Sequence, residues 1–325
     1  MIDAWEIKRY RSVSELDNSA YPALQHVIAH QLAVWPGHEP AIATSLGNQP
    51  ADVMAEVEEQ ALIVTQIAEH HFGGLGPVCE GYRYFCENMI LEAELHFRRH
   101  GRYERSTFAE ALRDVYSQPA VMEKYMNGLL LSGIFWSNHA RALHFYRTTF
   151  LPMLPDGFAH LEIGPGHGAL LHLTATHGRH GRIEAWDVSP SSIEATRRTL
   201  ETIGIADDVT LVCQDMMQAR SAAESFDSIV VSELLEHLED PLAALRALRP
   251  ALKPGGLILV NMPANSPAPD HLYLIDKPEE MTALMREAGY EIAASALFPM
   301  TGYSLERCIK DRLTITCIAI GRKSH

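Results

Sequence analysis

The first 150 residues have apolar positions at helical spacing, whereas short apolar runs typical of strands begin only near residue 158. In the first part, apolar side chains recur every three or four positions, which indicates helices with one buried face. These periodic segments are 22–35, 52–71, 78–100 and 107–116. A fifth, largely apolar segment over 119–151 predicts one bent helix or two. Residues 1–150 are therefore expected to form an all-helical domain.

Prolines, glycines and capping residues predict where these helices begin and end. Pro36-Gly37 would end the first helix, and 36–50 is expected to be a loop. Asp52 and Ser106 are placed to cap the second and fourth helices. Residues 1–20 are polar and show no clear period, so an arm or an irregular lead is expected there.

From residue 158 onward, strand-like runs alternate with helical ones. The expected strands are 158–163, 182–188, 209–214, 226–232 and 257–262, and the helices include 190–203, 241–252 and 278–288. This alternation predicts an α/β domain over 151–325, with a parallel sheet that holds a ligand at the carboxyl ends of its strands. Two final runs, 291–298 and 313–320, are separated by a loop and are expected to pair as an antiparallel hairpin at the sheet edge.

Composition and charge narrow the classes of function. The N-terminus is charged and no run of about 18 apolar residues occurs, so the sequence predicts a cytoplasmic protein without membrane insertion or secretion. A net charge of −14 without a large Lys/Arg cluster argues against a nucleic-acid partner. The five cysteines are scattered and include no Cys-x-x-Cys pair, so neither a disulfide framework nor a zinc site is indicated.

The clearest chemical motif is the glycine-rich stretch that ends the first expected strand. It reads Leu161-Glu162-Ile163-Gly164-Pro165-Gly166-His167-Gly168. Because glycine has no Cβ and permits positive φ, the backbone can turn sharply there and let a ligand lie against bare main chain. The residues that follow are typical of a helix. The stretch therefore predicts a cofactor loop.

Acidic residues lie at the ends of three successive strands: Glu162, Asp187 and Asp215. A carboxylate at the tip of the second strand is placed to accept both hydroxyls of a ribose. Asp215 would lie where an adenine amino group can donate to it, with Val188 and Met216 over the faces of the ring. Each acid could instead merely cap the following helix. Three acids in register favour a ligand.

These motifs resemble a known family. The Glu-x-Gly-x-Gly-x-Gly loop, Asp187, Gln214-Asp215 and the strand over 226–230 are similar to the successive motifs of class I S-adenosylmethionine-dependent methyltransferases. Segments 232–241 and 252–256 resemble the small-molecule branch that contains the ubiquinone-pathway methyltransferases.

The resemblance covers residues 156 to 320 and implies a Rossmann-like seven-stranded sheet with an antiparallel last strand. It also implies S-adenosyl-L-methionine as the cofactor, with residues 1–150 as a lid, substrate or oligomerisation domain. The cofactor-binding residues would be Glu162, Gly164, Gly166, Gly168, Asp187, Val188, Asp215, Met216 and Ser232.

Nicotinamide-dependent oxidoreductases are the competing class, since they also combine a glycine loop with an acid on the second strand. Their loop is Gly-x-Gly-x-x-Gly, and its helix start fits a pyrophosphate. Here the third glycine, Gly168, comes one residue earlier. S-adenosylmethionine has no phosphate, and its amino-acid end needs close backbone approach beside an acid such as Glu162. The spacing therefore favours S-adenosylmethionine.

Methyl transfer mainly requires that the acceptor be aligned and its proton removed, and histidine suits the second task. His237, after the fourth strand, and His271, after the fifth, are the candidate catalytic residues, although His237 could serve structure alone. Glu233, Glu236, His237 and a distant histidine resemble the metal ligands of small-RNA 2′-O-methyltransferases. Because the same string occurs in metal-free relatives, no metal is assigned.

Trp136, Asn138 and His139 lie together in an apolar helical segment, where polar groups need solvent or a partner, and with Tyr273 they are the candidate substrate-binding residues. The expected function is methylation of a small metabolite at oxygen, nitrogen or carbon, in a biosynthetic pathway such as that of a natural product. The alternatives are a peptide or protein methyltransferase and a catalytically idle partner protein. The helical domain is also a candidate for a homodimer contact.

Overall fold

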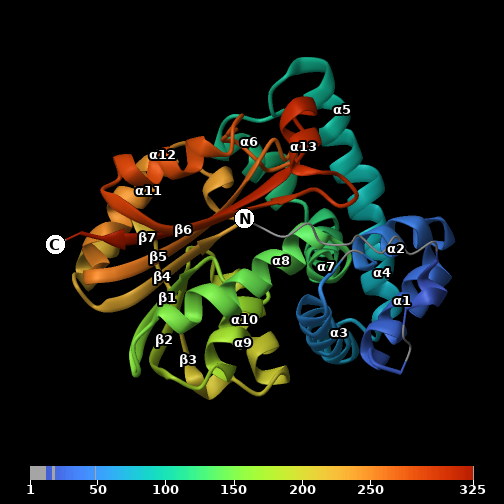
Figure 1. Cartoon of the computed structure of the whole chain (residues 1–325), viewed down its shortest axis with the longest axis horizontal. Helices are drawn as coiled ribbons and strands as arrows, with labels where there is room; N and C mark the ends of the chain where they lie inside the picture. The colour runs from blue at the N-terminus through green and yellow to red at the C-terminus, as the bar shows by residue number, and fades with distance from the viewer. Residues whose placement is uncertain (1–11, 17–18, 48, 325) are drawn as a thin grey trace.

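A computed structural model describes residues 12–16, 19–47 and 49–324, in which a helical region lies beside a covered sheet (Figure 1). The expected lead over residues 1–20 falls largely outside the described residues. The helices of the first part are α1 Pro22–Val34, α2 Glu39–Leu46, α3 Ala51–His71, α4 Leu75–Tyr84, α5 Leu91–His100, α6 Phe108–Ala111, α7 Pro119–Phe135 and α8 Ser137–Phe145. Three π-helical segments, Phe85–Ile90, Leu112–Tyr116 and Tyr146–Phe150, continue α4, α6 and α8. The predicted helical region is therefore confirmed.

The expectation of a loop over 36–50 is wrong. Pro36 opens a short 3-10 helix and Pro40 lies in the first turn of α2, so both prolines start helices. The apolar side chains of α2 are buried in the helical core. A helix of 8 residues contains too few apolar positions for their spacing to distinguish it from a loop.

Two predicted caps are also wrong. Asp52 lies inside α3, which begins after Pro50, and its Oδ1 accepts from the Val53 amide at 2.9 Å. The cap of α6 is Thr107 rather than Ser106. The Thr107 side chain accepts from the Glu110 amide and the Glu110 side chain accepts from the Thr107 amide.

The long apolar segment over 119–151 forms two helices, because Trp136 adopts an extended conformation between α7 and α8. Gly128 does not break α7. A Cβ at Gly128 would lie 2.5 Å from Cγ of Phe85, and one at Gly81 would lie 2.6 Å from Cβ of Asn127. These glycines therefore let α4 and α7 pack against each other at close range.

The sheet has seven strands in the order β3-β2-β1-β4-β5-β7-β6. The strands are β1 Phe158–Ile163, β2 His180–Asp187, β3 Val209–Cys213, β4 Phe226–Ser232, β5 Leu252–Ala264, β6 Tyr290–Pro299 and β7 Ile315–Lys323. The first five pair in parallel, and β7 is antiparallel to both of its neighbours, β5 and β6. The Rossmann-like sheet with an antiparallel last strand is therefore confirmed.

The connection between the last two strands differs from the expected loop. Helix α13, Leu305–Asp311, follows a cap at Ser304 whose side chain accepts from the Arg307 amide. The antiparallel pairing of β6 and β7 is confirmed, with β6 alone at the edge.

Helices cover both faces of the sheet (Figure 1). On one face, α11 Pro241–Leu248 and α12 Glu279–Glu287 pack into the largest apolar cluster. The other face carries α9 Ala169–Thr176 and α10 Pro190–Thr202, together with α8 and the π-helical segment after it. Because α8 already packs on the sheet, the division expected near residue 150 stays a prediction.

None of the helices in the described part of the chain combines the length and the apolar character that crossing a bilayer requires.

Candidate functional site

The glycine loop follows β1 and leads into α9. Gly164, Gly166 and Gly168 have φ values of 66°, 52° and 74°, which side chains with a Cβ rarely adopt. The Gly164 amide donates to the Trp186 carbonyl at 2.8 Å, so the loop is fixed to the neighbouring strand β2. A Cβ at Gly168 would also lie 2.8 Å from Cδ2 of Leu200 on α10. The three glycines are therefore required by the turn itself.

A cavity of about 250 Å³ lies between this loop and the helical region. Among the predicted site residues, its wall includes Glu162, Gly164, Gly166, Ser232 and His139. The opposite wall comes mainly from apolar side chains of α3, α7 and α8. The helical region thus faces the loop directly, as a lid would.

Glu162 is the most unusual group on the cavity wall. Its side chain is 3% exposed, and Oε2 has no hydrogen-bond partner among the described residues. Burial raises the pKa of Glu162 to about 8. A buried carboxyl without a partner is costly, so a cationic ligand would be stabilised strongly beside it.

Asp187 and Asp215 lie at the ends of neighbouring strands, and neither lines the cavity. Oδ1 of Asp187 accepts from the Ser189 amide, and Oδ1 of Asp215 accepts from the Met217 amide, each at 2.8 Å. Both carboxyls are half-buried, and burial raises the pKa of Asp187. Each acid thus orders the turn after its strand.

The two predicted ring contacts differ in exposure. Val188 is 62% exposed and can receive a ligand. Met216 is buried in the apolar cluster that also contains Trp186, so its side chain supports the core.

Ser232 and the acids after it form the next part of the wall. Oγ of Ser232 accepts from Nδ2 of Asn261 at 3.0 Å. Glu233, which lines the cavity, has a φ of 50°, and its Oε1 has no partner in the described structure. Burial raises the pKa of Glu233 to about 7, and burial beside Glu233 raises that of Glu236 well above its usual range. A half-buried acid, Glu233, and a fully buried one, Glu236, therefore lie close together after β4.

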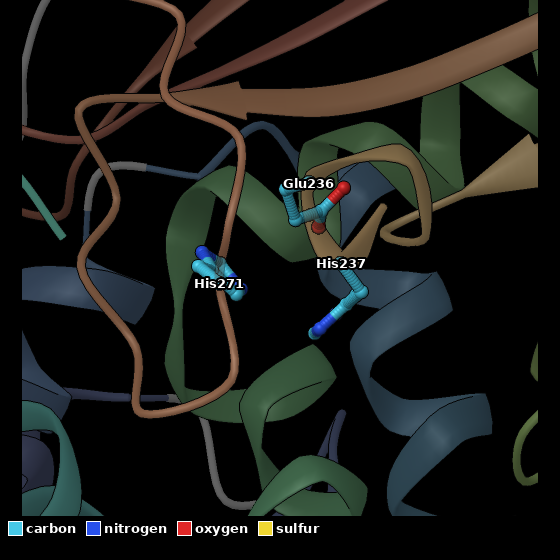
Figure 2. Close-up of side chains that lie close together, drawn as sticks. All are labelled: Glu236, His237 and His271. Atoms are coloured by element: carbon cyan, nitrogen blue, oxygen red, sulfur yellow. The ribbon is translucent and has the colours of Figure 1, made fainter. Parts of the chain in front are cut away.

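His237 and His271 lie together, with their ring centroids 4.8 Å apart and their planes at 90° (Figure 2). Nδ1 of His237 lies 3.2 Å from the carbonyl of Asp270 and 3.3 Å from the hydroxyl of Tyr116. Nδ1 of His271 lies 2.6 Å from the carbonyl of Ser266. Burial lowers the pKa of His271 to about 4. The structure therefore brings the two predicted catalytic residues into one cluster.

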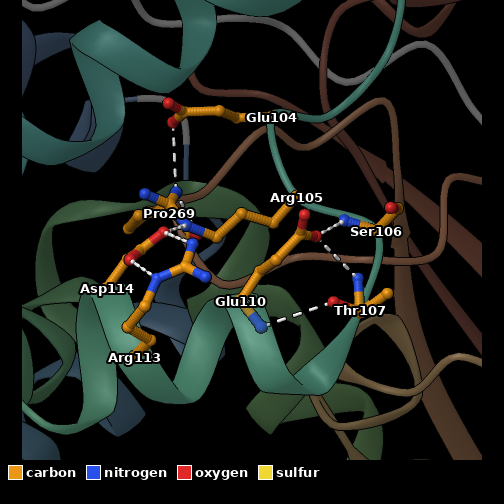
Figure 3. Close-up of polar contacts among 8 residues, drawn as sticks. All are labelled: Glu104, Arg105, Ser106, Thr107, Glu110, Arg113, Asp114 and Pro269. Carbon is orange, nitrogen blue, oxygen red and sulfur yellow. Dashed lines mark hydrogen bonds and ion pairs between the residues drawn. The ribbon is translucent and has the colours of Figure 1, made fainter.

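The helical region contributes groups to this cluster that the sequence did not reveal. Tyr116 donates to Oδ2 of Asp270 at 3.0 Å, and the Ser266 amide donates to the hydroxyl of Tyr103 at 3.1 Å. Arg105 donates to the carbonyl of Pro269 at 2.7 Å and to Glu104 and Asp114 (Figure 3). The contacts of Tyr103, Arg105 and Tyr116 with residues 266–270 span 154 to 164 residues of sequence, and no local pattern signals them.

The predicted substrate-binding residues are only partly on the cavity wall. His139 lines the cavity, with Nδ1 3.2 Å from Oγ of Ser132, and burial lowers its pKa to about 4. Trp136 instead donates to the hydroxyl of Tyr82 at 2.9 Å, and Asn138 donates to Oγ1 of Thr316 at 2.9 Å.

Tyr273 lies in the loop after β5, where its backbone amide donates to the carbonyl of Glu236 at 3.0 Å. Tyr273 packs against the largest apolar cluster rather than lining the cavity. Of the four predicted substrate contacts, His139 is the one placed to touch a ligand there.

Comparison with known proteins supports the motif analysis. Residues 135–295 match a family model described as a methyltransferase domain. A ubiquinone biosynthesis O-methyltransferase of Xanthomonas axonopodis pv. citri is 28% identical over 157 residues, covering 42% of this chain and 64% of the relative. One from Cereibacter sphaeroides is 35% identical over 118 residues, covering 36% and 46%. The chain thus spans about half to two thirds of the length of these relatives.

Among solved structures, that of the 4+2 cyclase SpnF has a TM-score of 0.46 and 20% sequence identity to this chain. The match covers 58% of this chain and 81% of the cyclase.

Proposed function

We propose that this chain carries a class I methyltransferase domain with S-adenosyl-L-methionine as its cofactor, and that the whole protein transfers a methyl group from this cofactor to a small metabolite. The observation that carries the proposal is the buried, unpartnered carboxyl of Glu162, which faces a cavity behind three glycines of positive φ. The amino group of S-adenosylmethionine is a cation that fits such a carboxyl, and the bare backbone leaves room for its amino-acid end.

The ribose and adenine of the cofactor would bind at the carboxyl ends of the same strands. Asp187 would accept the ribose hydroxyls, Asp215 would accept from the adenine amino group, and Val188 would cover one ring face. The cofactor supplies an activated methyl group when bound. The residues of the chain then have to place the acceptor in line with it and remove the acceptor's proton.

The acceptor is proposed to occupy the cavity between the loop and α3, α7 and α8. Its mainly apolar walls and volume of about 250 Å³ suit a small molecule. His139, on the cavity wall, is proposed to contact the acceptor. The cluster of His237 and His271, which does not itself line the cavity, is proposed to take up the acceptor proton. The acceptor atom (oxygen, nitrogen or carbon), the natural-product pathway, the cytoplasmic location and the homodimer remain parts of the proposal.

Isothermal titration of the full chain with S-adenosylmethionine tests the donor half of the proposal. Asp187→Ala removes the ribose contact and is expected to weaken binding about tenfold or more, because hydrogen bonds to charged groups contribute about 1.5 to 3 kcal/mol. Asp207→Ala, an exposed acid before β3, is the matched control and should bind as the wild type does. Absence of binding by the wild type, or full binding by Asp187→Ala, would contradict the assignment.

The competing classes give different results in the same experiments. A catalytically idle partner protein would bind the cofactor without consuming it in the presence of any acceptor. A peptide methyltransferase would label peptides rather than small molecules when supplied with cofactor that carries a radioactive methyl group. Label recovered in a small organic product is the expected outcome.

A further inference from the structure

We propose that the methyl acceptor is an uncharged molecule with an apolar body and a hydroxyl or N–H group, and that this group donates a hydrogen bond to Nε2 of His139. This substrate class rests on the proposed function, since the cavity holds a methyl acceptor only if the chain transfers a methyl group. The chemistry that the cavity binds can nevertheless be measured without methyl transfer.

Apolar side chains make up most of the wall that the helical region contributes to the cavity. From α3 they include Ile63, Val64 and Ile67, and from α7 and α8 they include Leu129, Leu130 and Leu143. A wall of this kind favours an apolar surface, because contact with it removes that surface from water. The body of the bound molecule is therefore expected to be apolar.

Four polar side chains from the helical region also line the cavity, and two of them already have hydrogen-bond partners. The hydroxyl of Ser132 donates to the Leu129 carbonyl at 2.8 Å. The hydroxyl of Tyr146 lies 2.5 Å from Oγ1 of Thr174. The remaining two side chains, His139 and Gln60, have hydrogen-bonding groups left over for a bound molecule.

The contacts of His139 leave Nε2 free to accept a hydrogen bond. Nδ1 lies 3.2 Å from Oγ of Ser132. Because the Ser132 hydroxyl already gives its proton to Leu129, Nδ1 must carry the imidazole proton and donate it to Oγ. Nε2 is then unprotonated, and it has no hydrogen-bond partner among the described residues. The ring of Trp136 packs edge-on against the imidazole, with the centroids 4.8 Å apart, and helps to hold it in this orientation.

Gln60 gives independent evidence for a ligand with a polar group. It is only 6% exposed, and its amide makes no hydrogen bond to any part of the chain that the structure describes. Helix α3 is fixed at this point, because the adjacent Glu59 pairs with Arg147 at 2.7 Å and with His172 at 3.1 Å. Buried amides are normally hydrogen-bonded. An amide held on a cavity wall without a partner therefore indicates a polar atom of a bound molecule.

The cavity lacks a cation that could pair with an anionic molecule. None of the described residues that line it is Lys or Arg. Burial lowers the pKa of His139 to about 4 and also lowers that of His167, the other histidine on the wall, so both are neutral at pH 7. A carboxylate or phosphate would lose its hydration here without gaining a counter-charge. The hydrogen-bonding groups and the missing cation together favour an uncharged molecule.

Matched small molecules test the donor group and the charge separately. Indole carries one N–H donor, N-methylindole lacks it, and indole carboxylate keeps it but adds a negative charge. Naphthol, methoxynaphthalene and hydroxynaphthoate repeat the comparison with a hydroxyl on another ring system. Ligand-observed NMR titration of the full chain at pH 7 measures each dissociation constant. We expect indole and naphthol to bind, their methylated forms to bind about tenfold more weakly, and the carboxylates about 100-fold more weakly.

Variants of His139 assign the preference to this side chain. His139→Leu removes the accepting nitrogen, so indole and N-methylindole should bind it with affinities equal to within about twofold. His139→Gln supplies an amide oxygen that can accept instead, and it should keep a preference for indole. His70, an exposed histidine at the end of α3, provides the matched control, and His70→Gln should show the wild-type preferences. A ratio measured within one variant does not change through loss of stability alone.

Circular dichroism confirms that each variant is folded. The proposal is overturned if neither indole nor naphthol binds, if the carboxylates bind as tightly as the uncharged compounds, or if folded His139→Leu keeps the tenfold preference. S-adenosylmethionine titration is run in parallel. Absence of cofactor binding together with the expected preferences would contradict only the proposed function. Cofactor binding without those preferences would contradict only the substrate class.

Discussion

Glycines serve different purposes in the helical region and in the α/β unit. In the loop after β1, Gly164, Gly166 and Gly168 have positive φ, so the local backbone conformation requires them. In the helical region, Gly81 and Gly128 lie inside helices, where a neighbouring helix leaves no space for a Cβ. The first requirement is visible in the local sequence. The second depends on a contact between segments that the sequence pattern does not place together.

The largest effect is expected at Gly128. A methyl group there would meet three atoms of Phe85 at 2.5 to 2.7 Å, and overpacking of this kind costs about 1 to 3 kcal/mol. Gly128→Ala should therefore lower the free energy of unfolding by about 2 kcal/mol, despite the better helix propensity of alanine. Urea denaturation of the full chain measures this change.

Gly133 provides the matched control on the same helix. A Cβ added at Gly133 would lie 3.5 Å from Cδ1 of Leu143, which is an ordinary van der Waals contact. Gly133→Ala should leave stability unchanged or raise it by up to about 1 kcal/mol. Equal effects of the two substitutions would show that close packing against Phe85 is not what requires glycine at position 128.

A smaller effect is expected in the cofactor loop. Gly166 has a φ of 52° with nothing within 4 Å of an added Cβ, so Gly166→Ala adds backbone strain alone. The free energy of unfolding should fall by about 1 kcal/mol, the usual cost of a left-handed alanine. Gly166→Asn should cost less, because asparagine tolerates this conformation better. If alanine and asparagine have equal effects, the positive φ is not what requires glycine here.

The two regions should respond alike to pH, because each contains buried histidines, of which His38 and His160 are one from each region. Burial lowers the pKa of His38 in the helical region to about 4 and that of His160 on β1 to about 3. Because the unfolded chain binds these protons more readily, the stability contribution is present above about pH 6.5 and is lost as the pH falls. Between pH 8 and pH 6 each histidine should remove about 0.8 kcal/mol.

His38→Gln and His160→Gln test this expectation separately. Each substitution should reduce the difference in unfolding free energy between pH 8 and pH 6 by that amount. Unfolding curves at both pH values measure it. A variant with the full wild-type difference would show that its histidine does not titrate on unfolding.

The sequence predicted the strands and turns whose conformation depends on neighbouring residues along the chain. The bounds predicted for β1 and β4 agree with the structure. The glycine loop was recognisable because its turn needs residues without a Cβ. Helix α2 was missed because its prolines resemble loop residues.

The parts of the site that were missed depend on tertiary contacts. Tyr116 lies on the helical region, and its hydrogen bond to Asp270 spans 154 residues of sequence. Trp136 and Asn138 were expected to face a ligand, yet their polar groups bond to Tyr82 and Thr316, which the sequence pattern could not pair with them.

The divided wall of the cavity has an evolutionary consequence. One side consists of the glycine loop and the strand ends, while the other consists of side chains from α3, α7 and α8. Substitutions on these helices can reshape the proposed acceptor space without disturbing the residues proposed to hold the donor. Under the proposed function, selection can therefore change which molecule is modified while the source of the methyl group stays the same.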